Sequence, residues 1–188
     1  MSVRPASPDD AHSITTVRAA SWRAGYAGVV PDEVLANVRE TPRPQMFDYL
    51  ADLPPQHHHF VAETPDGGIS GFCNGGPYRT DRDEDASAVG DDPGGEIFAI
   101  YVSPTHWGHG VGQALLDRSL RQLFDDGFGL VRLWVLADNP RARRFYEAAG
   151  FHTDGATGVF TAESTQLSIV RYRFEFDDST RPKSAGHP

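Results

Sequence analysis

The sequence has 188 residues and a formal net charge of -9, which suits one globular domain and argues against nucleic acid as the main partner. No stretch is long and apolar enough to span a membrane, and the N-terminus lacks a signal-peptide pattern. The one cysteine cannot form an internal disulfide, as expected in a reducing compartment. We therefore expect a cytoplasmic protein that binds neither nucleic acid nor membrane.

The N-terminal part predicts a strand over residues 3–5 and two helices. Ser7-Pro8 is typical of a helix start, with a capping residue before a first-turn proline, and apolar residues then recur at helical spacing up to Trp22. Residues 31–35 open a second, short helix, and Tyr26 lies in the break between the two. Both aromatic side chains, Trp22 and Tyr26, can pack into the core by their rings.

The next segment predicts a hairpin. Residues 41–56 are proline-rich and predict irregular chain with a helical turn near 47–50, and the strands of the hairpin are residues 60–63 and 69–74. The three successive histidines before the first strand cannot all point to one side of an extended segment, so the pattern disfavours a metal site. Cys73 has no base beside it in the pattern and is interpreted as a buried structural thiol.

A polar insert over residues 79–95 carries many acidic residues and several glycines. It is too polar for the core and too long for a tight hairpin. We interpret it either as a solvated loop or as a rim that attracts ammonium-bearing substrates to a neighbouring site.

Residues 96–124 have the order strand, glycine loop, helix. Apolar, β-rich residues end at Ser103-Pro104, then Gly108, Gly110 and Gly112 alternate, and apolar residues recur at helical spacing. Glycines let the backbone approach a ligand, and the first turn of a helix has N–H groups without internal partners. Together with the helix dipole, these groups suit a pyrophosphate. We favour this interpretation over a turn without a function, because strand, loop and helix agree.

The C-terminal part predicts the rest of the sheet. Residues 130–136 are almost continuously apolar, as in a strand covered on both faces, and the intervening helix makes this strand a parallel neighbour of residues 96–102. Asn139-Pro140 begins a helix that Gly150 ends. Residues 157–161 and 167–176 predict an antiparallel hairpin, and residues 177–188 a disordered tail.

The glycine loop and its surroundings resemble the GNAT superfamily of N-acetyltransferases. The acetyl-CoA loop of that family reads Arg/Gln-x-x-Gly-x-Gly/Ala, and it falls here on residues 107–112, Trp-Gly-His-Gly-Val-Gly. Both final glycines match, whereas Trp107 replaces the usual arginine or glutamine. The likeness continues at Tyr101-Val102-x-Pro104 and at Asp138-Asn139 with Phe145-Tyr146-x-x-x-Gly150-Phe151, so it covers most of the chain.

The resemblance implies a GNAT fold, which is one α/β domain over residues 1–176 with a mixed six- to seven-stranded sheet. Helices cover both faces, and the two central parallel strands splay apart. It also implies acetyl-CoA as co-substrate, and no metal. The pantetheine arm would add to the first parallel strand, and the pyrophosphate would lie on the glycine loop. The residues implied to bind the cofactor are Tyr101, Val102, Ser103, Trp107, Gly108, His109, Gly110, Val111, Gly112, Asn139 and Tyr146.

Two residues are candidates for proton transfer. Glu96 stands where several family members keep a catalytic glutamate and is implied to be the general base that deprotonates the amine; the alternative is an exposed strand-start carboxylate without a function. Tyr146 lies about two helical turns from Asn139 and is implied to be the general acid that protonates the departing thiolate. The alternative is a tyrosine packed in the core.

The implied reaction is transfer of an acetyl group from acetyl-CoA to a primary amine of a small molecule, and the acidic composition favours a cationic one. Trp22, Tyr26 and Glu96 are candidates for the acceptor pocket. Two alternatives stay open. One is a protein N-terminal or lysine acetyltransferase, and the other is a non-catalytic acyl-CoA-binding module, which the departure at Trp107 keeps open. A homodimer is compatible with the family.

Overall fold

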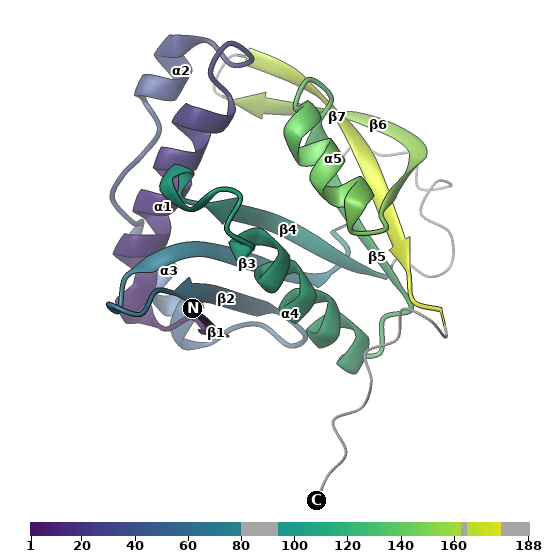
Figure 1. The fold of residues 1–188 in the computed structure, drawn as a ribbon, viewed down its shortest axis with the longest axis horizontal. Helices are drawn as coiled ribbons and strands as arrows, with labels where there is room; N and C mark the ends of the chain where they lie inside the picture. Colours follow the sequence, from purple (N-terminus) through teal and green to yellow (C-terminus); the bar gives the residue numbers. More distant parts are fainter. Residues whose placement is uncertain (80–93, 163–164, 178–188) are drawn as a thin grey trace, which may run out of the picture.

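The computed structural model describes residues 1–79, 94–162 and 165–177 (Figure 1). Most of the acidic insert and nearly all of the expected C-terminal tail lie outside these described residues. The expectations for both segments, and the domain boundary at residue 176, therefore stay predictions.

The described chain is built on a seven-stranded sheet in the order β1-β2-β3-β4-β5-β7-β6. All neighbouring strands are antiparallel except β4 and β5, which are parallel, so the expected mixed sheet is confirmed. The strands are β1 Ser2–Pro5, β2 His58–Glu63, β3 Ile69–Pro77, β4 Gly95–Val102, β5 Leu130–Leu136, β6 His152–Ala162 and β7 Thr165–Glu175.

The two parallel strands separate soon after they begin. They pair only at Gly95 with Val131 and at Glu96 with Arg132. From there the chains of β4 and β5 diverge toward Val102 and Leu136 (Figure 1). The expected splay is therefore present, and it leaves one backbone edge of β4 without a neighbouring strand.

Helices cover both faces of the sheet, as expected (Figure 1). On one face, α1 and α3 contribute Ala11, Ile14, Val17 and Leu50 to a buried cluster with Val61 and Phe72 of the sheet. On the other face, α4 and α5 contribute leucines and Tyr146 to the largest cluster. The helices are α1 Ala11–Gly25, α2 Asp32–Ala36, α3 Pro44–Ala51, α4 Val111–Asp125 and α5 Pro140–Ala148, with single 3-10 turns at Pro8–Asp10 and Pro104–His106.

A β-bulge in β4 lies beside the splay. Asn74 of β3 pairs with Ala99 and the next residue, Gly75, pairs with Ile97, so Phe98 is the extra residue. Ile97 packs into the cluster beneath α4, whereas Ala99 packs against the cluster beneath α1. Bulges redirect side chains in this way and are over-represented next to active sites.

Several elements are longer than the sequence pattern predicts. Helix α3 begins at Pro44, three residues before the expected turn, because a first-turn proline has no N–H to lose. Strand β6 begins at His152, five residues before the expected start, because a register shift between Thr153 and Thr157 absorbs a polar segment with Gly155 at φ +88°. Because these residues are polar, the sequence pattern did not predict the first half of β6.

Candidate active site

A cavity of about 490 Å³ fills the splay between β4 and β5. Its walls are β4 from Glu96 to Val102, the end of β5, the loop before α4, and α5, and Trp22, Tyr26 and Phe160 line it as well. This volume lies within the range of small-molecule sites. The cavity brings together Glu96, Tyr101, Val102, Trp107, Gly108, Gly110, Val111, Gly112, Asn139, Tyr146, Trp22 and Tyr26, all of which the sequence singled out.

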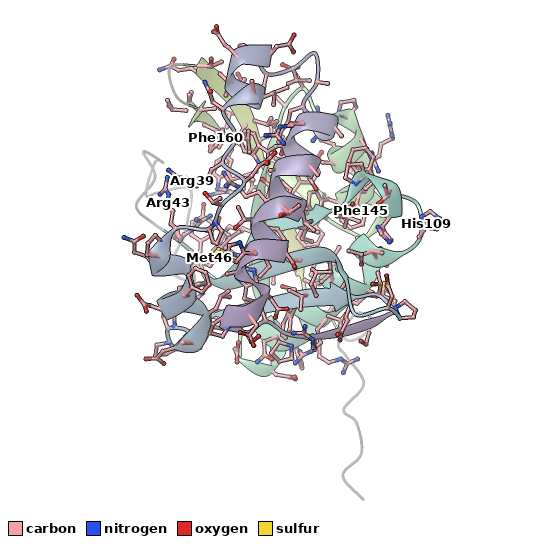
Figure 2. The ribbon with its side chains drawn as sticks, turned by 90° about the vertical axis from the view of Figure 1, so that its left-hand side faces the viewer. Arg39, Arg43, Met46, His109, Phe145 and Phe160 are labelled. Atoms are coloured by element: carbon pink, nitrogen blue, oxygen red, sulfur yellow. The ribbon has the colours of Figure 1, made fainter. Side chains whose placement is uncertain are left out.

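Two of the expected cofactor residues lie outside the cavity lining. Ser103 donates its backbone N–H to Ser70 O at 2.8 Å, so this group is already engaged within the sheet. His109 is exposed at the tip of the loop and projects away from the body of the protein (Figure 2). The other members of the predicted set occupy the cavity walls.

The glycine loop has the backbone geometry of an anion site. Gly108 and Gly110 adopt φ values of +79° and +78°, which L side chains rarely adopt, although an added Cβ would meet no atom within 4 Å at either position. Gly110 is also the N-cap of α4, and the first helical N–H bond runs from Ala114 to Gly110 O. The preceding turn, Val111 to Gln113, lines the cavity, as a pyrophosphate site requires.

Trp107 joins the loop to the end of β4. Its indole N–H donates to Val102 O at 2.7 Å, and Ser21 of α1 donates its hydroxyl to the same carbonyl at 2.8 Å. The guanidinium carbon of Arg141 lies 3.5 Å from the centre of the Trp107 rings. Arg141 also lines the cavity, and burial lowers the pKa of its guanidinium. The sequence analysis did not identify Arg141, although an arginine just after a helix N-cap is electrostatically unfavourable and could have been a signal.

Glu96 reaches the cavity but is bonded to Arg79. Its side chain is 1% exposed, and Arg79 donates from its backbone N–H and its Nε to Oε2, both at 3.1 Å. Arg79 Nη2 also donates to Oε1, at 2.5 Å, and the guanidinium lies 4.2 Å from the centre of the Phe98 ring. Glu96 is therefore not the exposed strand-start carboxylate of the alternative interpretation. Sequence reasoning missed Arg79, which lies 17 residues earlier in the chain.

Tyr146 lies on α5. Its side chain packs in the core and also lines the cavity. The ring contacts Phe145, Phe151 and Tyr172 edge-on or tilted, at centre distances of 5.1, 5.8 and 6.5 Å. Burial, with smaller contributions from Cys73 and Tyr101, raises the pKa of Tyr146 well above its usual value near 10, so the phenol stays protonated at neutral pH. Asn139 caps this helix, because its Oδ1 accepts the N–H of Ala142 at 3.0 Å.

An aromatic cluster lines the end of the cavity beside α1. The rings of Trp22 and Tyr26 meet edge-on at 4.9 Å, and Phe160 of β6 lies 5.9 Å from Trp22 and beside α1 (Figure 2). Trp22 donates its indole N–H to the Tyr101 hydroxyl at 2.9 Å. Trp22 is also part of a buried cluster with Val30, Val34 and Leu35. Trp22 therefore combines the two roles that the sequence left as alternatives.

The three histidines do not form a cluster of metal ligands. His58 and His59 are buried, and burial is the main cause that lowers their pKa values to about 3 and about 4. Within residues 1–79, 94–162 and 165–177, no group of three or more His, Cys, Asp and Glu side chains could hold a metal ion. Cys73 is fully buried, and burial raises the pKa of its thiol to about 12, as expected for a structural cysteine.

Comparison with known proteins identifies the fold and the family. Residues 21–151 match the model of the acetyltransferase (GNAT) family. The chain belongs to this family. An uncharacterized N-acetyltransferase, YuaI, from Bacillus subtilis is 31% identical over 150 residues, which are 79% of this chain and 78% of that protein. A mycothiol acetyltransferase from Catenulispora acidiphila is 45% identical over 67 residues, but these are only 36% of this chain and 21% of that protein.

Solved structures have the same GNAT fold. The PaiA N-acetyltransferase of Thermoplasma acidophilum, solved with coenzyme A, has a TM-score of 0.69 at 17% identity, over 93% of this chain and 98% of its own. YncA, a putative acetyltransferase of Salmonella typhimurium solved with acetyl-CoA, has a TM-score of 0.68 at 19% identity, over 98% and 99% of the two chains. The expected fold class is therefore confirmed.

Membership of the GNAT family also confirms the expected enzyme class, an N-acetyltransferase, and its acyl donor, acetyl-CoA. Among the described residues, no helix combines the length and the apolar character needed to cross a membrane. The acceptor, the residue roles and the expected cytoplasmic location are not decided by family membership.

Proposed function

We propose that this GNAT acetyltransferase acetylates a primary amine of a small molecule. The observation that carries the proposal is the continuity of the cavity, which runs from the glycine loop along β4 to the aromatic cluster of Trp22, Tyr26 and Phe160. Donor and acceptor can therefore meet inside one walled space, as direct transfer between them requires. An enzyme that modifies a folded protein needs an open groove at the acceptor end.

The chain holds its donor mainly with backbone groups. When bound, acetyl-CoA supplies the acetyl group activated as a thioester. Among the described residues, the edge of β4 that faces the splay has no strand partner beyond Glu96 and can offer peptide groups to an extended amide chain, in the way a sheet edge accepts another strand. The carbonyl of Val102 is excluded, because it already accepts from Trp107 and Ser21. The positive-φ glycines and the first turn of α4 offer N–H groups to the pyrophosphate. Asn139 lies at the same wall, where it caps α5.

The two proton-transfer roles stay part of the proposal. Glu96 takes the proton of the acceptor ammonium, directly or through water, while Arg79 keeps the carboxylate in place. A carboxylate has about four lone-pair sites, so the bonds from Arg79 do not by themselves exclude this role. We propose that Tyr146 donates its phenol proton to the departing thiolate; burial raises the pKa of the phenol, so this proton is present at neutral pH until the transfer.

The proposed positive charge of the acceptor has its support in the sequence. Glu96 is the one carboxylate in the described lining of the cavity, and Arg79 balances its charge. A cationic acceptor therefore rests on the acidic composition and on the acidic insert, most of which lies outside the described residues. The cytoplasmic location and the homodimer likewise stay predictions.

A thiol-release assay with acetyl-CoA tests the proposal. The amine panel spans polyamines, aminoglycosides, amino acids, small apolar amines, and peptides with a free N-terminus or lysine. We expect turnover on one small-molecule class and little on peptides. Turnover confined to peptides would favour the protein acetyltransferase. Tight binding of acetyl-CoA in calorimetry without turnover of any amine would favour the non-catalytic module.

A further inference from the structure

Trp107 contributes no positive charge to the glycine loop. The family pattern has arginine or glutamine there, whereas the indole N–H of Trp107 is used in its bond to Val102 O at 2.7 Å. His109 is the one basic residue between 107 and 112, and it projects away from the body of the protein (Figure 2). A pyrophosphate on this loop would therefore meet backbone dipoles but no cation from the loop itself.

Arg141 brings a cation to the cavity beside the glycine loop from another element, α5. It lies in the first turn of α5, lines the same cavity as Gly108 and Gly110, and places its guanidinium carbon 3.5 Å above the Trp107 rings. Planar guanidinium groups stack well on indole faces, which fixes their orientation. Among the described residues, Arg141 forms no ion pair, so its charge is not balanced by a protein carboxylate.

The position of Arg141 is costly unless an anion is present. The N-terminus of a helix carries partial positive charge, so a cation in the first turn of α5 is disfavoured. The residue as a whole is exposed, but its guanidinium is partly desolvated where it lies against the Trp107 rings, and this desolvation lowers the pKa of the guanidinium. An anion between the start of α4 and Arg141 would interact favourably with both.

We propose that Arg141, held flat on Trp107, binds the pyrophosphate of acetyl-CoA and replaces the cation that the loop lacks. This inference rests on the proposed function, because it assigns a residue to the same cofactor site. Trp107 is then a positioning residue, which orients Arg141 and ties the loop to the end of β4. The departure from the family pattern at Trp107 is in this way compensated by a residue on another helix.

The test is the affinity of Arg141→Gln for three donors, measured by calorimetry. The probes are acetyl-CoA, its 3'-dephospho form, which keeps the pyrophosphate, and acetyl-pantetheine, which has no phosphate. A charge-assisted hydrogen bond to phosphate predicts a Kd roughly 10- to 100-fold higher for the first two probes and unchanged for the third. The matched control is Arg144→Gln on the same helix, which is exposed and outside the cavity lining, and it should leave every Kd unchanged.

A double-mutant cycle tests the positioning role of Trp107. If Trp107 acts by holding Arg141, then Trp107→Leu weakens binding of acetyl-CoA in the wild type but much less in the Arg141→Gln background. Arg141→Lys should recover only part of the affinity, because an ammonium keeps the charge but not the planar stack.

The outcomes separate this inference from the proposed function. If wild-type protein does not bind acetyl-CoA, the proposed function fails. If wild type binds and Arg141→Gln binds equally well, the inference alone is wrong. A loss for acetyl-CoA but not for its 3'-dephospho form would assign Arg141 to the 3'-phosphate and overturn the pyrophosphate assignment.

Discussion

Glu96 and Arg79 form a pair whose two members have different surroundings. The Glu96 side chain is 1% exposed, whereas that of Arg79 is 38% exposed. Removal of Arg79 therefore takes a charged partner away from a buried carboxylate, whereas removal of the Glu96 charge leaves a guanidinium that water can reach. Because of this asymmetry, substitutions of the two residues can distinguish a catalytic role of Glu96 from a structural one.

We predict that Glu96→Gln lowers kcat/KM by roughly 100-fold or more, because general bases contribute about that much, while stability changes little. Arg79→Gln should show the opposite pattern, with a free energy of unfolding lower by up to about 3 kcal/mol and a smaller loss of activity. Steady-state kinetics across pH and urea denaturation of both variants measure the two effects. Equal losses of activity in both variants would mean that Glu96 serves as a structural partner.

At Tyr146 the catalytic role can be tested with little change in packing. Tyr146→Phe keeps the ring contacts with Phe145 and Phe151 but removes the phenolic proton. We expect kcat to fall roughly 100-fold, with the Kd of acetyl-CoA and the melting temperature nearly unchanged. Turnover equal to that of wild type at every pH would refute the general-acid role.

His59 is buried beside Phe72, and within the described residues neither ring nitrogen has a hydrogen-bond partner. Because burial lowers the pKa of His58 to about 3 and that of His59 to about 4, the unfolded chain takes up protons first as the pH falls. Their contribution to stability is complete above about pH 6.5 and is lost as the pH falls toward 4.

The expected loss between pH 7 and pH 5 is about 2 kcal/mol of unfolding free energy for each of these two histidines. His59→Phe can keep the stack on Phe72 and should remove about half of the pH dependence in urea denaturation. The exposed His152 provides the control, since His152→Gln should leave the dependence as it is. Parallel pH curves for His59→Phe and wild type would contradict this prediction.

At the scale of elements, side chains connect the two parts of the sheet where the backbone does not. Strands β4 and β5 share only two residue pairs. Arg171 of β7 donates to the Tyr78 hydroxyl at 3.1 Å, next to the end of β3, and to Asp154 Oδ2 of β6 at 2.8 Å. Arg171 and Asp154 are 3% and 9% exposed, so this pair lies in the interior.

We predict that Asp154→Asn lowers the free energy of unfolding by about 3 kcal/mol, because it removes a buried counter-charge of the Arg171 cation. The matched control is Glu40→Gln, which breaks the exposed ion pair with Arg23 and should cost less than about 1 kcal/mol. Urea denaturation measures both. Similar costs for the two substitutions would show that burial of the Asp154–Arg171 pair has no special effect.

At the scale of the whole molecule, the cofactor site lies between the two parts of the sheet. A ligand that pairs with the free edge of β4 and contacts α5 adds contacts across a splay that the backbone leaves open. Binding to the folded state alone stabilises it by mass action.

Acetyl-CoA at about 100 times its Kd should therefore add about 2.7 kcal/mol of stability and raise the melting temperature by roughly 5–10 °C. Differential scanning calorimetry with a ligand titration measures this shift. At the same ligand concentration, Arg141→Gln should show a smaller shift and Arg144→Gln the same shift as wild type. A melting temperature independent of acetyl-CoA would contradict the cofactor site itself.

The elements around the site and their order follow from local sequence patterns. Apolar runs, the stop at Ser103-Pro104, the alternating glycines and the Asn139 cap each depend on a few neighbouring residues, and the helix between two apolar strands requires a parallel pair. The parallel pair and the position of the glycine loop could therefore be predicted from these patterns, and the resemblance to the GNAT family implied the fold class and the enzyme class.

Which side chains contact one another depends on how the elements pack in three dimensions. Three contacts at the site join residues from different parts of the chain. They are the hydrogen-bonded pair of Arg79 and Glu96, the stack of Arg141 on Trp107, and the packing of Phe160 on Trp22. Local periodicity reports which face of an element is apolar, but polar contacts between elements depend on how those elements dock. In this protein the bulge at Phe98, the shifted register of β6 and the two-pair contact of β4 with β5 set that docking.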